Sequence, residues 1–212
     1  MLTLTVNEKV HNEDLSEYCK YVEWKQDVLE FFKAGAGREH YKLLSFLVKQ
    51  LPPQTIVGDI GTCYGLSGVA LAVNPNVAVI SYDIVDCFEA YSNLSKGKLT
   101  MKDCPRVYYR VANCLEPTEL AIIMNLPLLF LDVDPHDGLQ EINIIQALLK
   151  IGYTGIIVCD DIHLNAQMED WWSVKMPTFF PQLKRVDLTK YGHWSGTGAI
   201  VFDSSKYDIV IT

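Results

Sequence analysis

The sequence predicts an α/β fold: a doubly wound, Rossmann-like sheet of about seven strands, with helices before it and an antiparallel hairpin at its end. Three observations support this prediction. Short β-forming runs alternate with helical segments through most of the chain. The runs at 126–131 and 154–159 are apolar at consecutive positions, as strands covered on both faces are. A glycine-containing turn follows the first run, as in nucleotide-binding sheets.

The N-terminal part of the chain is predicted to be helical. Residues 14–33 carry apolar side chains near helical spacing, and the sequence GAG ends the pattern. A second helix is predicted over residues 38–51, where two prolines end it. We therefore divide the chain into an N-terminal helical extension, residues 1–37, and a sheet-containing domain, residues 38–212.

The rest of the chain alternates between predicted strands and helices. The last two strands, joined through residues 190–195, are expected to pair as an antiparallel hairpin. The other neighbours are expected to be parallel, because a helix connects each to the next. The predicted strands cover 55–61, 77–83, 106–111, 126–132, 154–160, 183–189 and 196–203, and the predicted helices cover 65–73, 87–95, 117–123 and 139–152.

Composition narrows the class of protein. A chain of 212 residues with 49% hydrophobic residues can form one domain with a full core. The net charge of −8 and the lack of clustered Lys and Arg argue against nucleic acid as a partner. Neither a signal peptide nor an apolar run long enough to span a membrane is evident. The six cysteines show no CxxC pair, so we expect reduced thiols in a cytoplasmic protein.

The turn after the first strand has the sequence GDIGTCYGLS, residues 58–67. It is neither a GxGxxG dinucleotide fingerprint nor a phosphate-binding P-loop. Gly61 and Gly65 allow a tight turn and a close backbone approach, whereas the carboxylate of Asp59 suits a cationic ligand better than a pyrophosphate. Asp83 ends the second strand about 20 residues further on, where a carboxylate can accept the hydroxyls of a ribose.

Carboxylates also end the fourth and fifth strands. Asp132 follows the fourth strand, and the pair Asp160-Asp161 follows the fifth. Neighbouring strands lie about 4.8 Å apart, so unpaired carboxylates there would repel each other and raise their pKa values. A hard divalent cation would relieve the repulsion. In the alternative interpretation, Asp132 faces the cofactor and the Asp pair caps a helix with a solvated neighbour.

These motifs resemble those of class I S-adenosylmethionine-dependent methyltransferases, over roughly residues 39–203. That family has an acidic residue, one residue, Gly, three residues and Gly, as in DIGTCYG, and an acidic residue that ends the second strand, as in ISYD. The resemblance implies a cofactor site with the methionine end at Asp59, Gly61, Gly65 and Ser67, the ribose at Asp83, the adenine edge at Asn113 and a further carboxylate at Asp132.

The strand-end carboxylates resemble those of cation-dependent O-methyltransferases. In the catechol type, a lysine base follows the first ligand by three residues, but here Pro135 stands there. In the macrocin-type sugar O-methyltransferases, a DGD motif supplies a metal ligand and then a base, and the sequence DVD, residues 132–134, is similar. The resemblance implies metal ligands at Asp132, Asp160 and Asp161, a base at Asp134, and His136 as the alternative base.

The expected function is therefore transfer of a methyl group from S-adenosylmethionine to a hydroxyl of a small molecule, with a sugar as one candidate. Mg²⁺ or another divalent cation would lower the pKa of that hydroxyl. Two alternatives stay open: a metal-independent methyltransferase with a structural Asp cluster, and a non-catalytic module that binds the cofactor. His163 is a less favoured base than His136.

Two further segments leave several interpretations open. Residues 191–198, YGHWSGTG, either line the mouth of the substrate site or form an ordinary glycine-rich hairpin turn. Residues 169–181 are rich in large apolar side chains. They could form a lid over the substrate, one face of a homodimer, or ordinary core packing.

Overall fold

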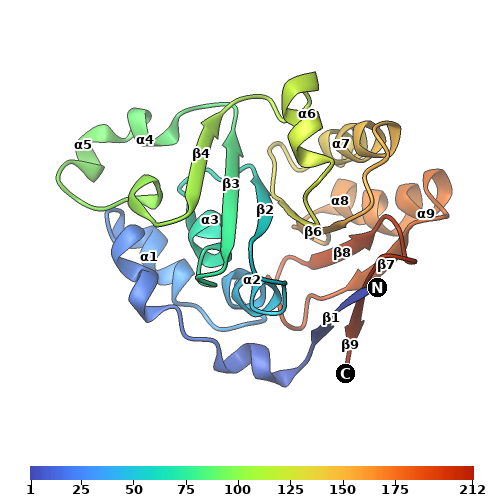
Figure 1. Ribbon diagram of the computed structural model, residues 1–212, viewed down its shortest axis with the longest axis horizontal. Coiled ribbons are helices and arrows are strands. Elements are labelled where there is room, and N and C mark those ends of the chain that lie inside the picture. The colour runs from blue at the N-terminus through green and yellow to red at the C-terminus, as the bar shows by residue number, and fades with distance from the viewer.

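The computed structural model describes residues 1–212 and confirms the predicted sheet (Figure 1). Seven strands form it in the order β4-β3-β2-β5-β6-β8-β7. The strands from β4 to β6 pair in parallel, whereas β8 is antiparallel to both β6 and β7. Their bounds are β2 Thr55–Ile60, β3 Val77–Asp83, β4 Val107–Val111, β5 Leu128–Leu131, β6 Ile156–Asp160, β7 Lys184–Asp187 and β8 Thr197–Val201.

The order of the sheet reverses between β2 and β5. From β2 the chain builds outward through β3 and β4, then returns to place β5 on the other side of β2. The connections after β2 and β5 therefore leave in opposite directions, which opens a crevice at the carboxyl ends of these two strands. The amide of Asp132 donates to the carbonyl of Ile60 at 3.0 Å, so the turns after both strands start side by side.

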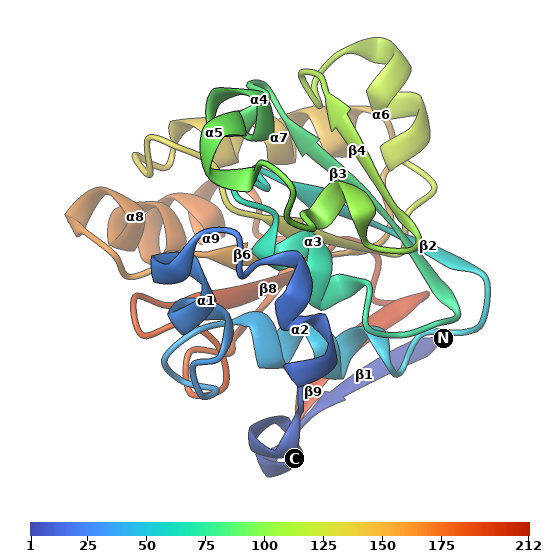
Figure 2. The same cartoon turned by 90° about the vertical axis from the view of Figure 1, so that its left-hand side faces the viewer.

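Helices cover both faces of the sheet. Figure 2 shows α2 and α3 on the opposite side of the sheet from α6 and α7. The buried apolar side chains form two clusters accordingly, one under the N-terminal helices and α3, the other under α6, α7 and α8. The helices are α1 Gln26–Phe32, α2 Tyr41–Val48, α3 Leu66–Leu71, α4 Cys87–Ala90, α5 Ser92–Ser95, α6 Pro117–Ile123, α7 Leu139–Lys150, α8 Ala166–Asp170 and α9 Met176–Phe179.

The N-terminal segment differs from the prediction of one helix over residues 14–33. It has a 3-10 turn, Ser16–Tyr21, and then the separate helix α1. Trp24 lies between them and is buried against the rings of Tyr64 and Phe88, at centroid distances of 6.0 and 5.7 Å. Burying this large side chain takes the chain off the helical path, because tertiary packing outweighs weak helix propensity.

The sequence analysis missed a strand pair at the two ends of the chain. Strand β1, Leu2–Val6, pairs in parallel with β9, Tyr207–Ile211, so the first and last strands lie side by side with the N- and C-terminal residues at opposite ends of the pair (Figure 2). Leu4 and Val6 are buried in the same cluster as the helices on that face of the sheet. The first 37 residues are thus not purely helical and share a core with the sheet, while the division at residue 37 stays a prediction.

The apolar segment 169–181 is mainly core packing. Its helix α8 continues through a π-helical turn, Trp171–Lys175, into α9. Trp171 and Met176 are fully buried, and a Cβ at Gly198 would meet the ring of Trp172 at 2.5 Å. Separately, none of the helices in the fold is long and apolar enough to cross a membrane.

Candidate active site

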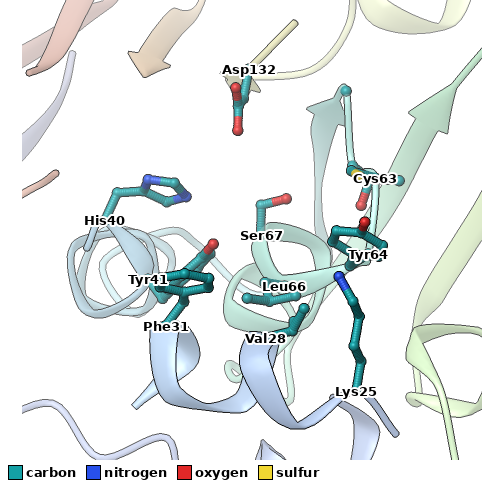
Figure 3. A pocket seen from close by; sticks show the side chains of 12 residues that line it. Lys25, Val28, Phe31, His40, Tyr41, Cys63, Tyr64, Leu66, Ser67 and Asp132 are labelled. Carbon is teal, nitrogen blue, oxygen red and sulfur yellow. The ribbon is translucent and has the colours of Figure 1, made fainter. Parts of the chain in front are cut away.

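A cavity of about 200 Å³ opens at the crevice between β2 and β5 (Figure 3). Its wall combines the turn after β2, the end of β5 and the N-terminal helices. The volume lies below the roughly 300–1,000 Å³ of sites that enclose a drug-sized ligand, so it suits one end of such a molecule. The lining residues are Lys25, Val28, Phe31, His40, Tyr41, Gly61, Thr62, Cys63, Tyr64, Leu66, Ser67 and Asp132.

The two predicted glycines shape this turn in different ways. Gly61 has φ of 86°, and a Cβ there would lie 1.7 Å from the carbonyl oxygen of Asp132. Gly65 has φ of 87°, and a Cβ there would meet Met101 at 2.5 Å, behind the cavity. Both positions need a left-handed backbone and leave no room for a side chain. Of the two, only Gly61 lines the cavity.

Asp59 does not line the cavity, and its expected contact with the cofactor stays a prediction. Its side chain is fully buried and accepts a hydrogen bond from the hydroxyl of Ser81 on the neighbouring strand. It points toward α3, where a Cβ at Gly68 would lie 3.0 Å from its Oδ2. Burial raises the pKa of Asp59, while hydrogen bonds from Ser81 and the turn lower it. Asp59 therefore stabilises the turn through hydrogen bonds on its buried side.

Asp83 and Asn113 lie at the ends of the next two strands. Asp83 accepts the amide of Cys63 at 2.8 Å and that of Val85 at 3.1 Å, one on each carboxylate oxygen. Each oxygen keeps a free lone pair, so the carboxylate can still accept two hydroxyls. Asn113 is exposed, and its Oδ1 accepts the amide of Leu115 at 3.0 Å, which leaves its NH₂ group free.

The strand-end carboxylates lie together, and histidines pair with them. Asp160 Oδ2 lies 3.1 Å from His40 Nδ1 and 3.2 Å from His193 Nδ1. Asp161, which has φ of 59°, lies 3.3 Å from His193 Nδ1 and 3.5 Å from His136 Nδ1. The repulsion expected among unpaired carboxylates is therefore relieved in part within the chain itself.

Two hydroxyls and a further carboxylate complete this cluster. The Ser195 hydroxyl donates to Asp161 Oδ1 and lies 2.7 Å from His193 Nδ1, and the Thr197 hydroxyl lies 3.3 Å from Asp160 Oδ1. On the other side of the imidazole, Glu39 Oε1 lies 3.6 Å from His193 Nε2.

The pKa values follow from burial and charge. Burial opposes protonation of His193, but hydrogen bonds to Asp160 and Asp161 outweigh it and raise its pKa to about 10. Burial likewise opposes the ionised form of Asp160, yet the two histidines hold its pKa well below the usual range. Asp132 has no such partner, so burial and then repulsion by Asp160 raise its pKa well above the usual range.

The predicted metal ligands do not form a single set. Asp132 and Asp161 come together with His136, each offering one ligand atom within 4.8 Å of the others. Asp160 and Asp161 form a second group of this kind with His193. Either group would hold a cation with mixed nitrogen and oxygen ligands. Such a set suits Mn²⁺, Fe²⁺ or Zn²⁺ at least as well as Mg²⁺, which prefers oxygen.

The remaining predicted residues differ in how close they lie to the cluster. The side chain of Asp134 is 96% exposed, and its Oδ1 lies 3.4 Å from His136 Nε2. His136 thus lies between Asp134 and Asp161. His163 bonds Glu169 at 2.5 Å and Asp187 at 3.0 Å, so its ring is held by groups outside the cluster.

Sequence reasoning missed the residues that neutralise the cluster. His40 lies before α2 and Glu39 precedes it, and nothing in their local pattern distinguishes them from a helix start. His193 and Ser195 belong to YGHWSGTG, whose pattern fits a hairpin turn and a site segment equally well. Because β8 is antiparallel to β6, Thr197 pairs with Asp160, and the turn before it lies over the Asp pair.

Comparison with known proteins supports the fold. No known family's sequence profile matches the chain, and no curated protein is similar enough in sequence to match it. Among solved structures, the SAH-bound methyltransferase PaMTH1 of Podospora anserina is similar at 16% identity, with 90% of this chain and 88% of that chain covered and a TM-score of 0.59. The SAM-bound O-methyltransferase TomG of Streptomyces achromogenes is similar at 15% identity, with 91% of both chains covered and a TM-score of 0.56.

A third structure of the same kind is the O-methyltransferase from Bacillus cereus in complex with SAH. It is 17% identical, with 89% of this chain and 91% of that chain covered and a TM-score of 0.54. The chain therefore has the Rossmann-like methyltransferase fold that the sequence predicted.

Replacing Gly61 by Ala tests the steric constraint on the turn. Gly61→Ala combines the left-handed backbone with a collision against the Asp132 carbonyl, so we expect it to lower the free energy of unfolding by at least about 3 kcal/mol. Gly152 has φ of 75°, and a Cβ there would have no atom within 4 Å, so Gly152→Ala should cost only about 1 kcal/mol. Urea unfolding measures both, and equal losses would contradict the steric argument.

The raised pKa of His193 predicts a pH dependence of stability. The protonated imidazole stabilises the fold fully below its unfolded pKa of about 6.5, and this contribution is lost as the pH rises toward about 10. His193→Gln should therefore weaken the fall in unfolding free energy between pH 6.5 and 10, by at most about 1.4 kcal/mol per pH unit. Urea unfolding with a chelator present measures this. Identical slopes in variant and wild type would exclude a raised pKa.

Proposed function

We propose that this chain is an S-adenosylmethionine-dependent O-methyltransferase that acts on a hydroxyl of a small molecule. One observation carries the proposal: the cavity beside Gly61 and Asp132 adjoins a buried cluster of carboxylates and histidines. The cavity offers a place for the methyl donor, and the cluster offers groups that can orient a hydroxyl and take its proton. The fold shared with the SAM-bound and SAH-bound structures supports this assignment.

The residues present fit the cofactor. Asp83 keeps two free lone pairs for the ribose hydroxyls, and Gly61 lets a ligand approach the backbone closely. Ser67 and Asp132 line the cavity where the methionine end would lie, and Asn113 has a free NH₂ group for the adenine edge. When bound, S-adenosylmethionine supplies a methyl group activated by its positively charged sulfur. The chain's part is to hold the acceptor oxygen in line with that methyl.

A sugar or another cyclic polyol is the acceptor that the surroundings favour. Trp194 stands in the turn over the Asp pair, is 67% exposed, and has its ring 5.6 Å from that of His193. An exposed aromatic face can cover the apolar C–H face of a sugar ring. The exposed carboxylate of Asp134 and the half-buried carboxylate of Asp137, in the turn after β5, can accept its hydroxyls.

His136 is the base that the geometry favours over Asp134. Its ring lies between Asp134 and Asp161, at 3.4 and 3.5 Å, and its side chain is 21% exposed. A base must be close to both the acceptor oxygen and the cofactor, which favours the more enclosed side chain. Asp134 would then orient the imidazole, as a carboxylate does in a hydrogen-bonded acid–base pair.

A divalent cation would fit best at Asp132, Asp161 and His136. A bound cation lowers the pKa of a coordinated hydroxyl and so assists removal of its proton. If His136 binds the cation, it cannot also act as the base, and Asp134 then takes that role. The metal-independent alternative uses the histidines as the only counter-charges of the carboxylates. The alternative of a non-catalytic module shares the cofactor site but predicts no turnover.

Cofactor binding is the first test of this function. We expect S-adenosylhomocysteine to bind the wild type in isothermal titration calorimetry, and Asp83→Asn to weaken it about 10-fold, because one ribose acceptor is lost. Asp14→Asn, an exposed change in the N-terminal segment, is the matched control and should leave the affinity unchanged. No binding heat with the wild type at millimolar ligand would reject the function.

Metal dependence is tested by titrating Mn²⁺ and Mg²⁺ into the protein with S-adenosylhomocysteine present. We expect binding of Mn²⁺ at least as tight as that of Mg²⁺, because one ligand is an imidazole. Asp161→Asn should weaken it at least 10-fold. If neither ion produces heat, and methyl transfer to a panel of sugars and polyols continues in EDTA, the metal-independent alternative holds.

A matched pair of variants distinguishes the two candidate bases. With a labelled methyl donor and an accepted sugar or polyol, His136→Asn should lower kcat about 100-fold or more. Asp134→Asn should lower kcat less than about 10-fold, and neither change should alter the affinity for S-adenosylhomocysteine. A larger loss in Asp134→Asn would assign the base to Asp134 and leave His136 as a ligand or a positioning residue.

A further inference from the structure

His40 connects the carboxylate cluster to the cavity. It directly precedes α2, and its side chain is 3% exposed, packed between the rings of Tyr41 and Phe130 at centroid distances of 4.4 and 4.6 Å. Nδ1 lies 3.1 Å from Asp160 Oδ2, an ion-pair contact whose angle falls short of a hydrogen bond. The ring points into the cavity, toward Ser67 (Figure 3).

Nε2 of this imidazole has no partner in the protein. An unpaired buried polar atom is destabilising, and buried polar groups in native proteins are nearly always paired. The imidazole packs against these two aromatic rings with Nδ1 beside Asp160, so Nε2 is the ring nitrogen left without a partner in the chain. A molecule in the cavity is therefore the partner that this geometry requires.

The surroundings of His40 indicate what kind of partner this is. Nδ1 lies against Asp160, so Nε2 is the ring nitrogen left to bond a molecule in the cavity. An imidazole nitrogen donates or accepts a hydrogen bond according to where its proton lies, and the amino-acid group of S-adenosylmethionine offers both a carboxylate acceptor and an ammonium donor. The cavity, at about 200 Å³, has room for an amino-acid group but not for a nucleoside as well.

We propose that His40 is a positioning residue whose Nε2 forms a hydrogen bond with the amino-acid group of S-adenosylmethionine. This inference rests on the proposed function. It links the cofactor's amino-acid end to Asp160 through one imidazole, so that the methyl donor and the strand-end carboxylates are held relative to each other. Neither the GDIGTCYGLS turn nor the strand-end aspartates supplies an imidazole at this point of the cavity.

Lys25 is the other residue of the cavity that could contact the amino-acid group of the cofactor. It also lines the cavity, but its Nζ lies 3.7 Å from the centre of the Tyr64 ring, a close cation–π contact (Figure 3). A lysine held in this way is directed at the aromatic ring, whereas His40 Nε2 is free. The two residues make different predictions, because only the one that contacts the amino-acid group should distinguish ligands with and without that group.

The test compares two ligands by isothermal titration calorimetry. S-Adenosylhomocysteine carries the amino-acid group, and 5′-methylthioadenosine has the same nucleoside and sulfur without it. We expect His40→Ala to weaken S-adenosylhomocysteine about 10- to 100-fold and 5′-methylthioadenosine by less than about 3-fold. His40→Gln, which keeps an N–H donor near the position of Nε2, should recover part of the loss. Lys25→Ala should show no such selectivity.

Three outcomes would overturn the inference while the proposed function stands. They are equal loss of both ligands in His40→Ala, unchanged affinity for both, and a selective loss in Lys25→Ala in place of His40→Ala. Thermal unfolding of each variant identifies a loss of fold, and His40→Gln supplies the measurement if His40→Ala does not fold. If the wild type binds neither ligand, the proposed function fails and the inference fails with it.

Discussion

The carboxyl ends of β5 and β6 depend on neutralising buried negative charge. Asp132, Asp160 and Asp161 follow two adjacent parallel strands whose side chains are covered on both faces of the sheet. Removing a carboxylate from water is costly unless a counter-charge and hydrogen bonds replace the lost hydration. His40 and His193 supply this for Asp160, and His193 and Ser195 supply it for Asp161. Asp132 keeps no such partner, so it is the carboxylate best placed to bind something from outside.

The two histidines that neutralise the carboxylates come from segments far apart in the sequence. His40 comes from the segment before α2, and His193 comes from the turn between β7 and β8. The turn reaches the carboxyl end of β6 only because β8 runs antiparallel and enters the sheet between β6 and β7. The terminal hairpin is therefore a part of the site. The pairing of β1 with β9 separately adds the first and last strands to the core on the α2 side of the sheet.

The same arrangement relates the metal-dependent and metal-independent interpretations. A histidine cation and a metal ion can each neutralise the negative charge of the carboxylates. A metal can use an imidazole as a ligand only when the coordinating ring nitrogen has lost its proton. Metal binding here would have to displace protons from the cluster. The two interpretations thus describe one set of side chains in two states of charge, which is why direct titration of the ion is more decisive than counting ligands.

The sequence by itself determined the alternation of strands and helices from residue 55 to residue 203, the glycine-containing turn after β2, and the carboxylates at the strand ends. Local periodicity and turn residues can be read from a short stretch of sequence. The general rule that parallel strands end at one edge of the sheet then places the carboxylates together. The sequence also placed Gly61, whose left-handed turn leaves no alternative residue. The sequence did not reveal that Asp59 lies beneath the turn, because which face of a short strand is enclosed depends on the helix packed over it.

Only the tertiary structure decided which side chains meet those carboxylates. His40 and Asp160 are far apart in the sequence, as are β1 and β9, and no local pattern encodes which distant residues become neighbours. The exposure of Asp134 and the enclosure of His136, two residues apart, likewise depend on how one loop packs. DVD, residues 132–134, and YGHWSGTG, residues 191–198, were visible as separate motifs. They come together because an antiparallel strand brings the second to the end of β6, beside the strand end where the first begins.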